Sequence, residues 1–383
     1  MRNDFETRCI HGNIDEALTD CYRSISFPIY QTASFSHIKT GHNESGFDYT
    51  RESNPTRQRV EEVVAALENA EYASAFTSGM AAVTAIMDMF DYGSHIVCSE
   101  DLYGGVIRLH NTINHKNGVT VSYVDTTDTS AIASAINTST RAIYIETPSN
   151  PMMNITDIRK TAEIAHSNGL ILIVDNTFLS PYFQNPLDLG ADIVIHSGSK
   201  FLSGHNDTIS GFVCTNNREL SDKIRLIQKT TGASLPPFDS WLVMRGIKTL
   251  SVRMQRQQEN ALKVADFLLS HPKVSHIYYP GLKEHKGFEV NRSQSSGSGS
   301  MISFSVDSAE TAENILKKVR LITFAESLGG TESLITYPVL QTHPDVPKEM
   351  RDKLGITDTL LRLSVGLESA ADIISDLEKA LEG

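Results

Sequence analysis

The sequence is poor in the features that mark secreted, membrane or nucleic-acid-binding proteins. It has four cysteines in 383 residues, with no Cys-x-x-Cys pair and no Cys/His cluster at zinc-ligand spacing, which argues against a disulfide scaffold or a zinc site. No apolar run approaches the roughly 20 residues of a membrane helix. The first residues are polar, unlike a signal peptide.

Positive charge is also in short supply. Lysine and arginine total 34 against 46 aspartate and glutamate residues, which gives a formal net charge of −12. Such a surface repels phosphate backbones and anionic membranes. We therefore expect a soluble, cytoplasmic protein with no metal site, which binds neither nucleic acid nor a membrane.

What the sequence does contain is a regular alternation of apolar and helical segments between residues 75 and 230. Short apolar strands separated by helices are typical of a mostly parallel sheet covered on both faces, so the fold class is α/β. The strands are predicted at residues 95–98, 119–124, 142–145, 170–174, 192–195 and 209–213.

The chain changes character on either side of this segment. Residues 30–35 predict a short strand, and residues 41–52 predict an exposed arm rich in Gly, Asn and Ser. Residues 238–270 lack proline and predict one long helix that bridges two domains. We divide the chain into an N-terminal arm (1–56), a large α/β domain (57–240), and a bridging helix with a smaller α+β domain (241–383).

The most informative residues follow the predicted strand at 192–195. A turn of serine and glycine leads into Lys200, at the edge where open α/β sheets bind ligands. A partly desolvated lysine is a nucleophile toward carbonyls, and Ser197 and Ser199 could bind a phosphate. Alone, the segment also fits a surface lysine after a turn.

Other strand ends carry complementary chemistry. Asp175 could hydrogen-bond the protonated ring nitrogen of pyridoxal phosphate, or cap a helix. The backbone at Ser78-Gly79-Met80 opens a predicted helix and could bind phosphate, although a plain serine cap is equally compatible. Tyr103 could stack on a flat ring or simply occupy a turn. In chain order these residues are a phosphate-binding loop, a stacking aromatic, an aspartate for the ring nitrogen and a lysine. That is the layout of a fold-type-I pyridoxal-phosphate enzyme.

Nine segments then identify a resemblance to a known family across essentially the whole chain. The sequence resembles the Cys/Met-metabolism (trans-sulfuration) enzymes, which use pyridoxal phosphate. The matching segments are Tyr49-Thr-Arg-Glu-Ser-Asn-Pro-Thr56, Ser78-Gly-Met80, Asp101-Leu-Tyr-Gly-Gly105, Glu146-Thr-Pro-Ser-Asn-Pro151, Val174-Asp-Asn-Thr-Phe178, His196-Ser-Gly-Ser-Lys200, Gly204-His205, Glu326-Ser-Leu-Gly-Gly330 and Leu361-Arg-Leu-Ser-Val-Gly366.

The resemblance implies a fold-type-I transferase fold with a seven-stranded sheet and a smaller C-terminal α+β domain. It implies Lys200 as the lysine that binds pyridoxal phosphate covalently, with Tyr103 stacked on the ring and assisting proton transfer if the pocket lowers its pKa. The other implied cofactor-binding residues are Ser78, Gly79, Met80, Asp175, Ser197, Ser199, Tyr49 and Arg51. The implied substrate-binding residues are Arg362, Asn150, Ser327, Glu326 and Arg108.

The resemblance also implies an assembly. Tyr49 and Arg51 would reach the phosphate of a neighbouring subunit, which explains the exposed arm. The family is usually a homotetramer built from two active dimers, so an arm that acts in trans makes the dimer obligatory.

Departures from the family pattern bear on the substrate. Position 105 is glycine where methionine γ-lyases carry a reactive cysteine, and Glu326 resembles the γ-synthase and γ-lyase subgroup. Glu52 stands where some bacterial γ-synthases have a second arginine. We expect γ-replacement or γ-elimination on homoserine-derived amino acids by a cystathionine γ-synthase or γ-lyase. Cystathionine β-lyase or O-acetylhomoserine sulfhydrylase is the alternative.

Overall fold

A computed structural model describes the chain except residues 1–2, 14–19, 41–42, 345 and 383. Its centre is a seven-stranded sheet in the order β1-β7-β6-β5-β4-β2-β3, in which β7 alone runs antiparallel to its neighbours. The predicted mostly parallel sheet is therefore confirmed. Its strands are β1 (Tyr72–Phe76), β2 (His95–Ser99), β3 (Thr120–Val124), β4 (Thr140–Glu146), β5 (Ile171–Asp175), β6 (Ile193–Ser197) and β7 (Gly211–Thr215).

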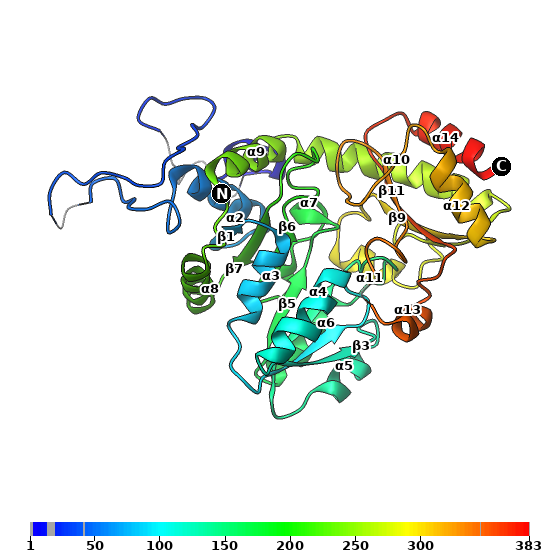
Figure 1. The fold of residues 1–383 in the computed structure, drawn as a ribbon, viewed down its shortest axis with the longest axis horizontal. Coiled ribbons are helices and arrows are strands. Elements are labelled where there is room, and N and C mark those ends of the chain that lie inside the picture. The colour runs from blue at the N-terminus through cyan, green and yellow to red at the C-terminus, as the bar shows by residue number, and fades with distance from the viewer. Residues whose placement is uncertain (1–2, 14–19, 41–42, 345, 383) are drawn as a thin grey trace.

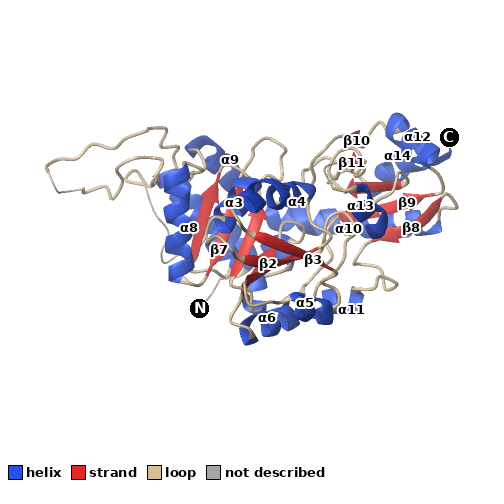
Figure 2. Cartoon of the chain, turned by 60° about the horizontal axis from the view of Figure 1, so that its bottom comes forward, coloured by secondary structure: helices blue, strands red, loops and turns tan. Residues whose placement is uncertain are grey.

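Helices cover both faces of this sheet. Leu172 and Val174 of β5 pack into one core, and Ile173 between them packs into the other, as the two-residue period of a strand requires. Figure 2 shows α3 and α4 on one side of the sheet and α5 and α6 on the other. The helices of this part are α2 (Pro55–Glu68), α3 (Gly79–Met87), α4 (Gly104–Leu109), α5 (Thr129–Ala135), α6 (Ile158–Ser167), α7 (Ser180–Phe183) and α8 (Arg218–Thr231).

The prediction of one continuous helix over residues 238–270 is wrong, because the structure divides this segment into α9 (Pro237–Ile247) and α10 (Leu250–Ser270). A buried arginine side chain, that of Arg253, lies across this break. The buried guanidinium of Arg253 donates to the carbonyl oxygens of Gly246 at 3.0 Å and Phe201 at 2.8 Å. These bonds satisfy a carbonyl that the helix break releases.

A second sheet of five strands has the order β10-β11-β12-β9-β8. With α10, α12 and α14 it encloses a separate apolar core, which confirms the smaller α+β unit; α10 runs between the two sheets (Figure 1). Its strands are β8 (Val274–Tyr278), β9 (Met301–Val306), β10 (Thr323–Phe324), β11 (Leu334–Thr336) and β12 (Leu360–Ser364), and the remaining helices are α1 (Phe5–His11), α11 (Phe288–Gln294), α12 (Ala309–Lys318), α13 (Lys348–Leu354) and α14 (Ala370–Glu382). The boundary that we propose at residue 240 falls within α9 and remains a proposal.

The described residues between α1 and α2 include a segment that extends away from this body (Figure 1), whereas α1 itself packs against α2 and α10. The strand predicted at 30–35 is not formed there. The described residues of the arm form one isolated bridge, between Ser34 and Tyr49, with backbone hydrogen bonds from Thr50 N to Ala33 O and from Phe35 N to Asp48 O. A strand needs a longer ladder than this, and the arm has no third segment beside it.

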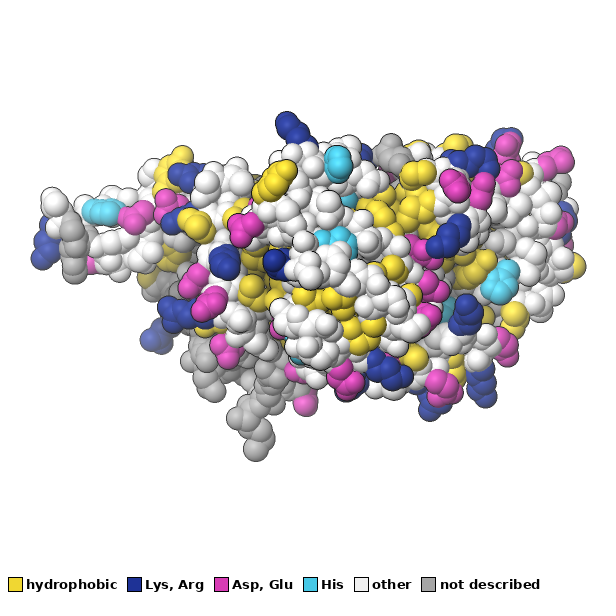
Figure 3. All heavy atoms as spheres, turned by 90° about the horizontal axis from the view of Figure 1, so that it is seen from below, with side chains coloured by type: hydrophobic (Ala, Val, Ile, Leu, Met, Phe, Trp, Pro, Cys, Tyr) yellow, Lys and Arg dark blue, Asp and Glu magenta, His cyan; other side chains and the backbone are white. Residues whose placement is uncertain are grey.

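The surface of the body carries mixed charge. On the face shown in Figure 3, the described lysine and arginine side chains are scattered among acidic ones. No helix of the described residues combines the length and apolarity that crossing a membrane requires. No group of three or more His, Cys, Asp or Glu side chains within the described residues is placed to bind a metal ion.

Candidate active site

A cavity of about 1030 Å³ lies between the two sheets. Its walls come from the carboxyl ends of β4, β5 and β6, the start of α3 and the strand β12. Most of the residues predicted from the sequence meet there. Those that line it are Ser78, Gly79, Met80, Tyr103, Asn150, Asp175, Ser197, Ser199, Lys200, Glu326, Ser327 and Arg362.

Lys200 lies in the turn that follows β6, with its Nζ donating to Ser327 Oγ at 3.0 Å. Burial lowers the pKa of Lys200 to about 8; the positive charge of Arg362 adds to this effect, and Glu326 opposes it. A lysine with a pKa of about 8 has an appreciable fraction of neutral amine near neutral pH. It is therefore suited to nucleophilic attack on a carbonyl and to proton transfer.

Asp175 ends β5 and faces the same cavity. Its Oδ1 accepts hydrogen bonds from Thr177 N at 2.9 Å and from Thr177 Oγ1 at 2.6 Å. Burial raises the pKa of Asp175, while the two bonds from Thr177 and the proximity of His196 oppose the rise. Thr177 Oγ1 also accepts from Ser197 N at 2.9 Å, so this residue, which the sequence reasoning missed, joins the ends of β5 and β6.

An anion cradle lies where α3 begins. The Ser78 hydroxyl caps this helix by accepting from Ala81 N at 3.0 Å. A Cβ added at Gly79 would lie 3.0 Å from Ser197 Cβ, a tight contact, so glycine eases the close approach of the helix start to the turn after β6. Backbone N–H groups of the first helical turn and the Ser197 hydroxyl thus border one end of the cavity, an arrangement that binds phosphate.

Ser199 has a different environment from Ser197. Its hydroxyl donates to Ser210 O at 3.2 Å and accepts from Ser210 N at 2.9 Å. It therefore joins the turn after β6 to the strand β7, while still lining the cavity.

Arg362, on β12, forms the opposite end of the cavity and is 2% exposed. Its guanidinium donates to Asn150 Oδ1 at 2.7 Å and to Ser327 O and Thr336 Oγ1, both at 3.3 Å. Burial lowers the pKa of Arg362 to about 10, which leaves it charged at neutral pH. Its buried Nε has no hydrogen-bond partner among the described residues. This N–H can therefore donate a hydrogen bond to a carboxylate ligand.

Asn150 is positioned by a residue that the sequence reasoning did not assign. Asp101 accepts hydrogen bonds from the Ser149 hydroxyl, from Met152 N at 3.2 Å and from Asn154 Nδ2 at 3.3 Å. These bonds fix the loop that carries Asn150. Burial raises the pKa of Asp101 to about 6, against the lowering effect of these three donors.

Tyr103 lines the cavity at the start of α4. A Cβ added at Gly105 would lie 2.5 Å from Tyr103 Cε1, so glycine at 105 lets the ring lie over the helix start. Burial raises the pKa of Tyr103 and outweighs the opposing charges of Arg108 and Arg362. The lowered pKa on which its role in proton transfer depends is therefore not found in this structure.

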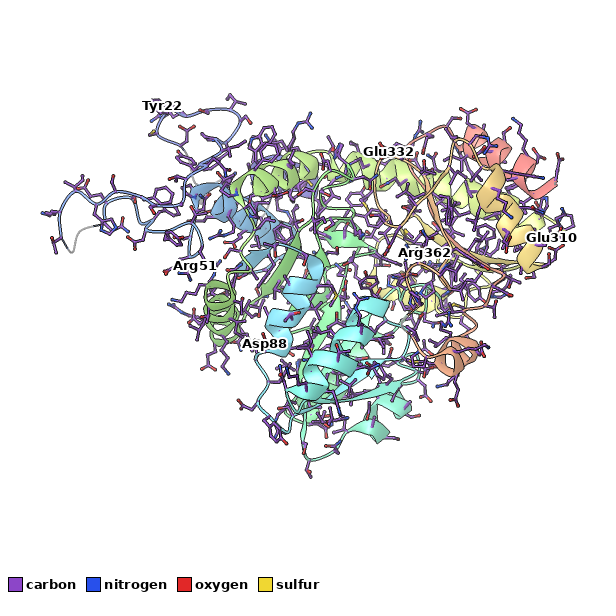
Figure 4. The ribbon with its side chains drawn as sticks, viewed as in Figure 1. Tyr22, Arg51, Asp88, Glu310, Glu332 and Arg362 are labelled. Atoms are coloured by element: carbon purple, nitrogen blue, oxygen red, sulfur yellow. The ribbon has the colours of Figure 1, made fainter. Side chains whose placement is uncertain are left out.

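Three of the predicted residues lie outside the cavity of their own chain. Arg108 is exposed on α4. The Arg51 guanidinium donates to the carbonyl of Lys229 and lies 5.5 Å from the centroid of the Tyr49 ring. Figure 4 shows Arg51 beside α8, away from Arg362. Contact of the arm with a neighbouring subunit remains a prediction.

Comparison with known proteins bears on this geometry. Residues 6–382 match the family described as Cys/Met metabolism PLP-dependent enzyme, where PLP is pyridoxal phosphate. The chain belongs to this family. It is therefore a PLP-dependent enzyme of cysteine and methionine metabolism, as the motifs predict.

Several members of the Cys/Met metabolism family, which have different enzyme names, are similar to this chain. A cystathionine γ-lyase of Bacillus subtilis is 47% identical over 379 residues, covering 98% of this chain and 99% of the relative. A cystathionine γ-synthase of Haemophilus influenzae is 48% identical over 358 residues, covering 93% and 92%. The crystal structure of a Lactobacillus plantarum cystathionine γ-lyase complexed with L-serine has a TM-score of 0.96 at 44% identity, covering 99% of each chain. Other relatives are named cystathionine β-lyase.

Proposed function

We propose that this enzyme removes or replaces the γ-substituent of homoserine-derived amino acids, as a cystathionine γ-lyase or γ-synthase does. The observation that carries the proposal is the relation of Lys200 to Arg362. Ser327 contacts both, through its hydroxyl to Lys200 at 3.0 Å and through its carbonyl to Arg362 at 3.3 Å. An amino acid whose carboxylate binds Arg362 therefore has its α-carbon close to the Lys200 amine.

The residues of the cavity fit PLP. The start of α3 at Ser78, Gly79 and Met80, with Ser197, would bind the phosphate. Asp175 would hold a proton at the ring nitrogen, since it is a carboxyl group with two fixed donors of its own. When bound, PLP supplies an electron-withdrawing ring that stabilises negative charge at the substrate α-carbon.

The remaining residues act on the amino-acid substrate. Arg362 would bind the α-carboxylate with two hydrogen bonds, because a planar guanidinium matches that geometry. Asn150 orients the guanidinium through the 2.7 Å bond to its Oδ1. Lys200, with a pKa lowered to about 8, would remove the α-proton as a general base and carry protons between the α-, β- and γ-carbons.

Glu326 favours γ-chemistry over the β-lyase alternative on this scaffold, and glycine at position 105 argues against a methionine γ-lyase. Glu326 lines the cavity and its charge raises the proton affinity of Lys200, so it would favour return of a proton to the leaving group. Position 105 offers no thiol. When the cysteine thiol adds at the γ-carbon, the γ-substituent is replaced. When no nucleophile adds, the substituent is eliminated, and hydrolysis by water then gives 2-oxobutyrate and ammonia.

Cystathionine β-lyase is the second candidate, because relatives of that name from Lactococcus lactis are 43% identical over 98% of this chain. The two reactions break different bonds of the same molecule. γ-Elimination of cystathionine gives cysteine, 2-oxobutyrate and ammonia, whereas β-elimination gives homocysteine, pyruvate and ammonia.

The deciding experiment identifies the keto acid formed by the purified holoenzyme from cystathionine, and the product formed from O-acetylhomoserine and cysteine. We expect 2-oxobutyrate from the first or cystathionine from the second. The Lys200→Ala variant should lose both products, and Glu310→Gln, at an exposed position of α12 (Figure 4), should keep them. Pyruvate as the sole keto acid, without synthesis of cystathionine, would overturn the proposal.

We also propose a homotetramer of two active dimers, in which the arm supplies Tyr49 and Arg51 to the neighbouring subunit. Tyr49 is 43% exposed on the projecting arm, which makes it available for such a contact. We propose a cytoplasmic location because all four cysteines are free thiols, the form that a reducing compartment maintains.

A further inference from the structure

Glu146 is a buried acid in the floor of the cavity, and neither the motifs nor the proposed reaction assigns it a role. It is the last residue of β4 and is 5% exposed. In the sheet it pairs in register with Asp175, the last residue of β5. Both side chains line the same cavity. The structure therefore places two carboxyl groups side by side beneath the proposed cofactor site.

The two carboxyl groups have unequal partners. Asp175 accepts two hydrogen bonds from Thr177, at 2.9 and 2.6 Å. Glu146 accepts one, from Tyr103 N to its Oε2 at 3.0 Å. No ion pair to Glu146 is formed by the described side chains. Because fixed donors favour an ionised carboxylate, negative charge is more stable on Asp175 than on Glu146.

The charges around Glu146 agree with this division. Asp175 and Asp101 both raise the pKa of Glu146, and Arg362 and the Tyr103 N–H lower it. Burial is the largest cause, and the net result is a pKa well above the ordinary value. Neighbouring acids in a shared site commonly divide the proton in this way, one neutral and one ionised.

We propose that Glu146 is a positioning residue that acts as a neutral carboxylic acid. Its Oε2 accepts the backbone N–H of Tyr103 and so fixes the aromatic ring that would stack on the cofactor. Its lack of charge leaves Asp175 as the sole carboxylate at the floor of the cavity. The inference depends on the proposal that PLP occupies this cavity, and not on whether the reaction is γ- or β-specific.

A neutral role and an ionised role predict opposite effects of amidation. Glu146→Gln keeps the size, the carbonyl acceptor and the neutral charge. We therefore expect kcat and KM to change less than about threefold, and the midpoint of the pH titration of cofactor absorbance to move by less than about 0.3 pH units. Glu146→Ala removes the acceptor for Tyr103 N and should weaken PLP retention about tenfold. An ionised role would instead make Glu146→Gln defective as well, because the amide removes the negative charge.

Infrared spectroscopy of the apoenzyme tests the protonation directly. At pH 7 we expect a carbonyl band of a protonated carboxylic acid that Glu146→Gln removes and the exposed control Glu310→Gln retains. Absence of that difference band would overturn the proposal. So would a Glu146→Gln variant that loses PLP as readily as Glu146→Ala, or that fails to fold, because a neutral isostere should be tolerated. The infrared result is independent of the products formed from cystathionine, so it separates this proposal from the proposed function.

Discussion

Burial sets the proton affinities of the individual residues in the cavity. It is the largest cause of the changed pKa at Lys200, Asp101 and Arg362. Desolvation destabilises the charged form of any group, so it makes the lysine a weaker base and the aspartate a weaker acid. Arg362 remains charged because its pKa starts far higher. The same physical cause thus increases the neutral fraction of Lys200 and leaves Arg362 as a fixed cation in the same cavity.

Asp101 provides a prediction at this scale. Burial raises its pKa from 3.8 to about 6, so the folded state binds the proton more tightly than the unfolded state does. The associated stabilisation is fully present below about pH 4 and is lost as the pH rises through about 6. A shift of about two units corresponds to on the order of 3 kcal/mol.

We expect Asp101→Asn to reduce the fall in unfolding free energy between pH 4 and pH 7 relative to the wild-type protein. Urea titrations at several pH values in this interval measure it. The exposed Asp125→Asn serves as a control, since its loop has no part in the cavity. Parallel pH profiles of the wild-type protein and Asp101→Asn would contradict the assignment.

Each element begins and ends where a side chain or a distant contact satisfies its backbone. The helix α2 starts at Pro55 behind Asn54, whose Oδ1 accepts from Thr56 N at 2.9 Å. The Asn54 amide also donates to Tyr30 O at 2.9 Å and to Thr50 Oγ1 at 3.1 Å. The buried Asn54 side chain therefore caps α2 and also binds two segments of the arm, at Tyr30 and at Thr50, to the start of this helix.

Asn54→Ala should for this reason cost more than the loss of an ordinary helix cap. We expect a loss of about 2 kcal/mol, because the substitution removes the hydrogen bonds to Tyr30 O and Thr50 Oγ1 as well as the cap. The matched control is Asn217→Ala, an exposed cap of α8 that accepts only from Leu220 N, at 3.2 Å, and should cost about 1 kcal/mol or less. Denaturation midpoints compare them, and equal losses would argue against the linking role of Asn54.

The whole molecule places its cavity between two sheets and its arm outside both. The cavity needs residues from the seven-stranded sheet, such as Asp175, and from the five-stranded sheet, such as Arg362. The relative position of the two sheets therefore determines the distance between cofactor and substrate groups. Arg51, with the Tyr49 ring next to it, lies beside α8 and outside the cavity of its own chain (Figure 4), which fits a role in a second subunit.

Mixing two inactive variants tests this arrangement. Arg51→Ala should weaken PLP retention, and Lys200→Ala should abolish turnover. In a mixed dimer, one site combines an intact Lys200 with an intact partner arm. Random pairing then restores activity to roughly a quarter of the wild-type value. Activity assays after co-refolding measure it, and no gain over Arg51→Ala alone would contradict an arm that acts in trans.

Local pattern was sufficient to predict most of the parallel sheet and the order of its chemical groups. The strands at β2 to β6 could be predicted because an apolar run is a property of neighbouring residues. Strands β1, β8 and β11 were not predicted. They carry mixed or short patterns such as Leu334–Thr336, and become strands only by pairing with distant segments.

The sequence by itself determined the α/β architecture, the family and the residues that could hold PLP, since these depend on local periodicity and on motifs at strand ends. Only the tertiary structure decided the break at Thr249, the position of Arg51 outside its own cavity and the pairing of Glu146 with Asp175. Each of these involves contacts between residues far apart in the chain, such as that of Arg253 with Phe201. Burial, which governs the protonation of the site, exists only once those segments have packed together.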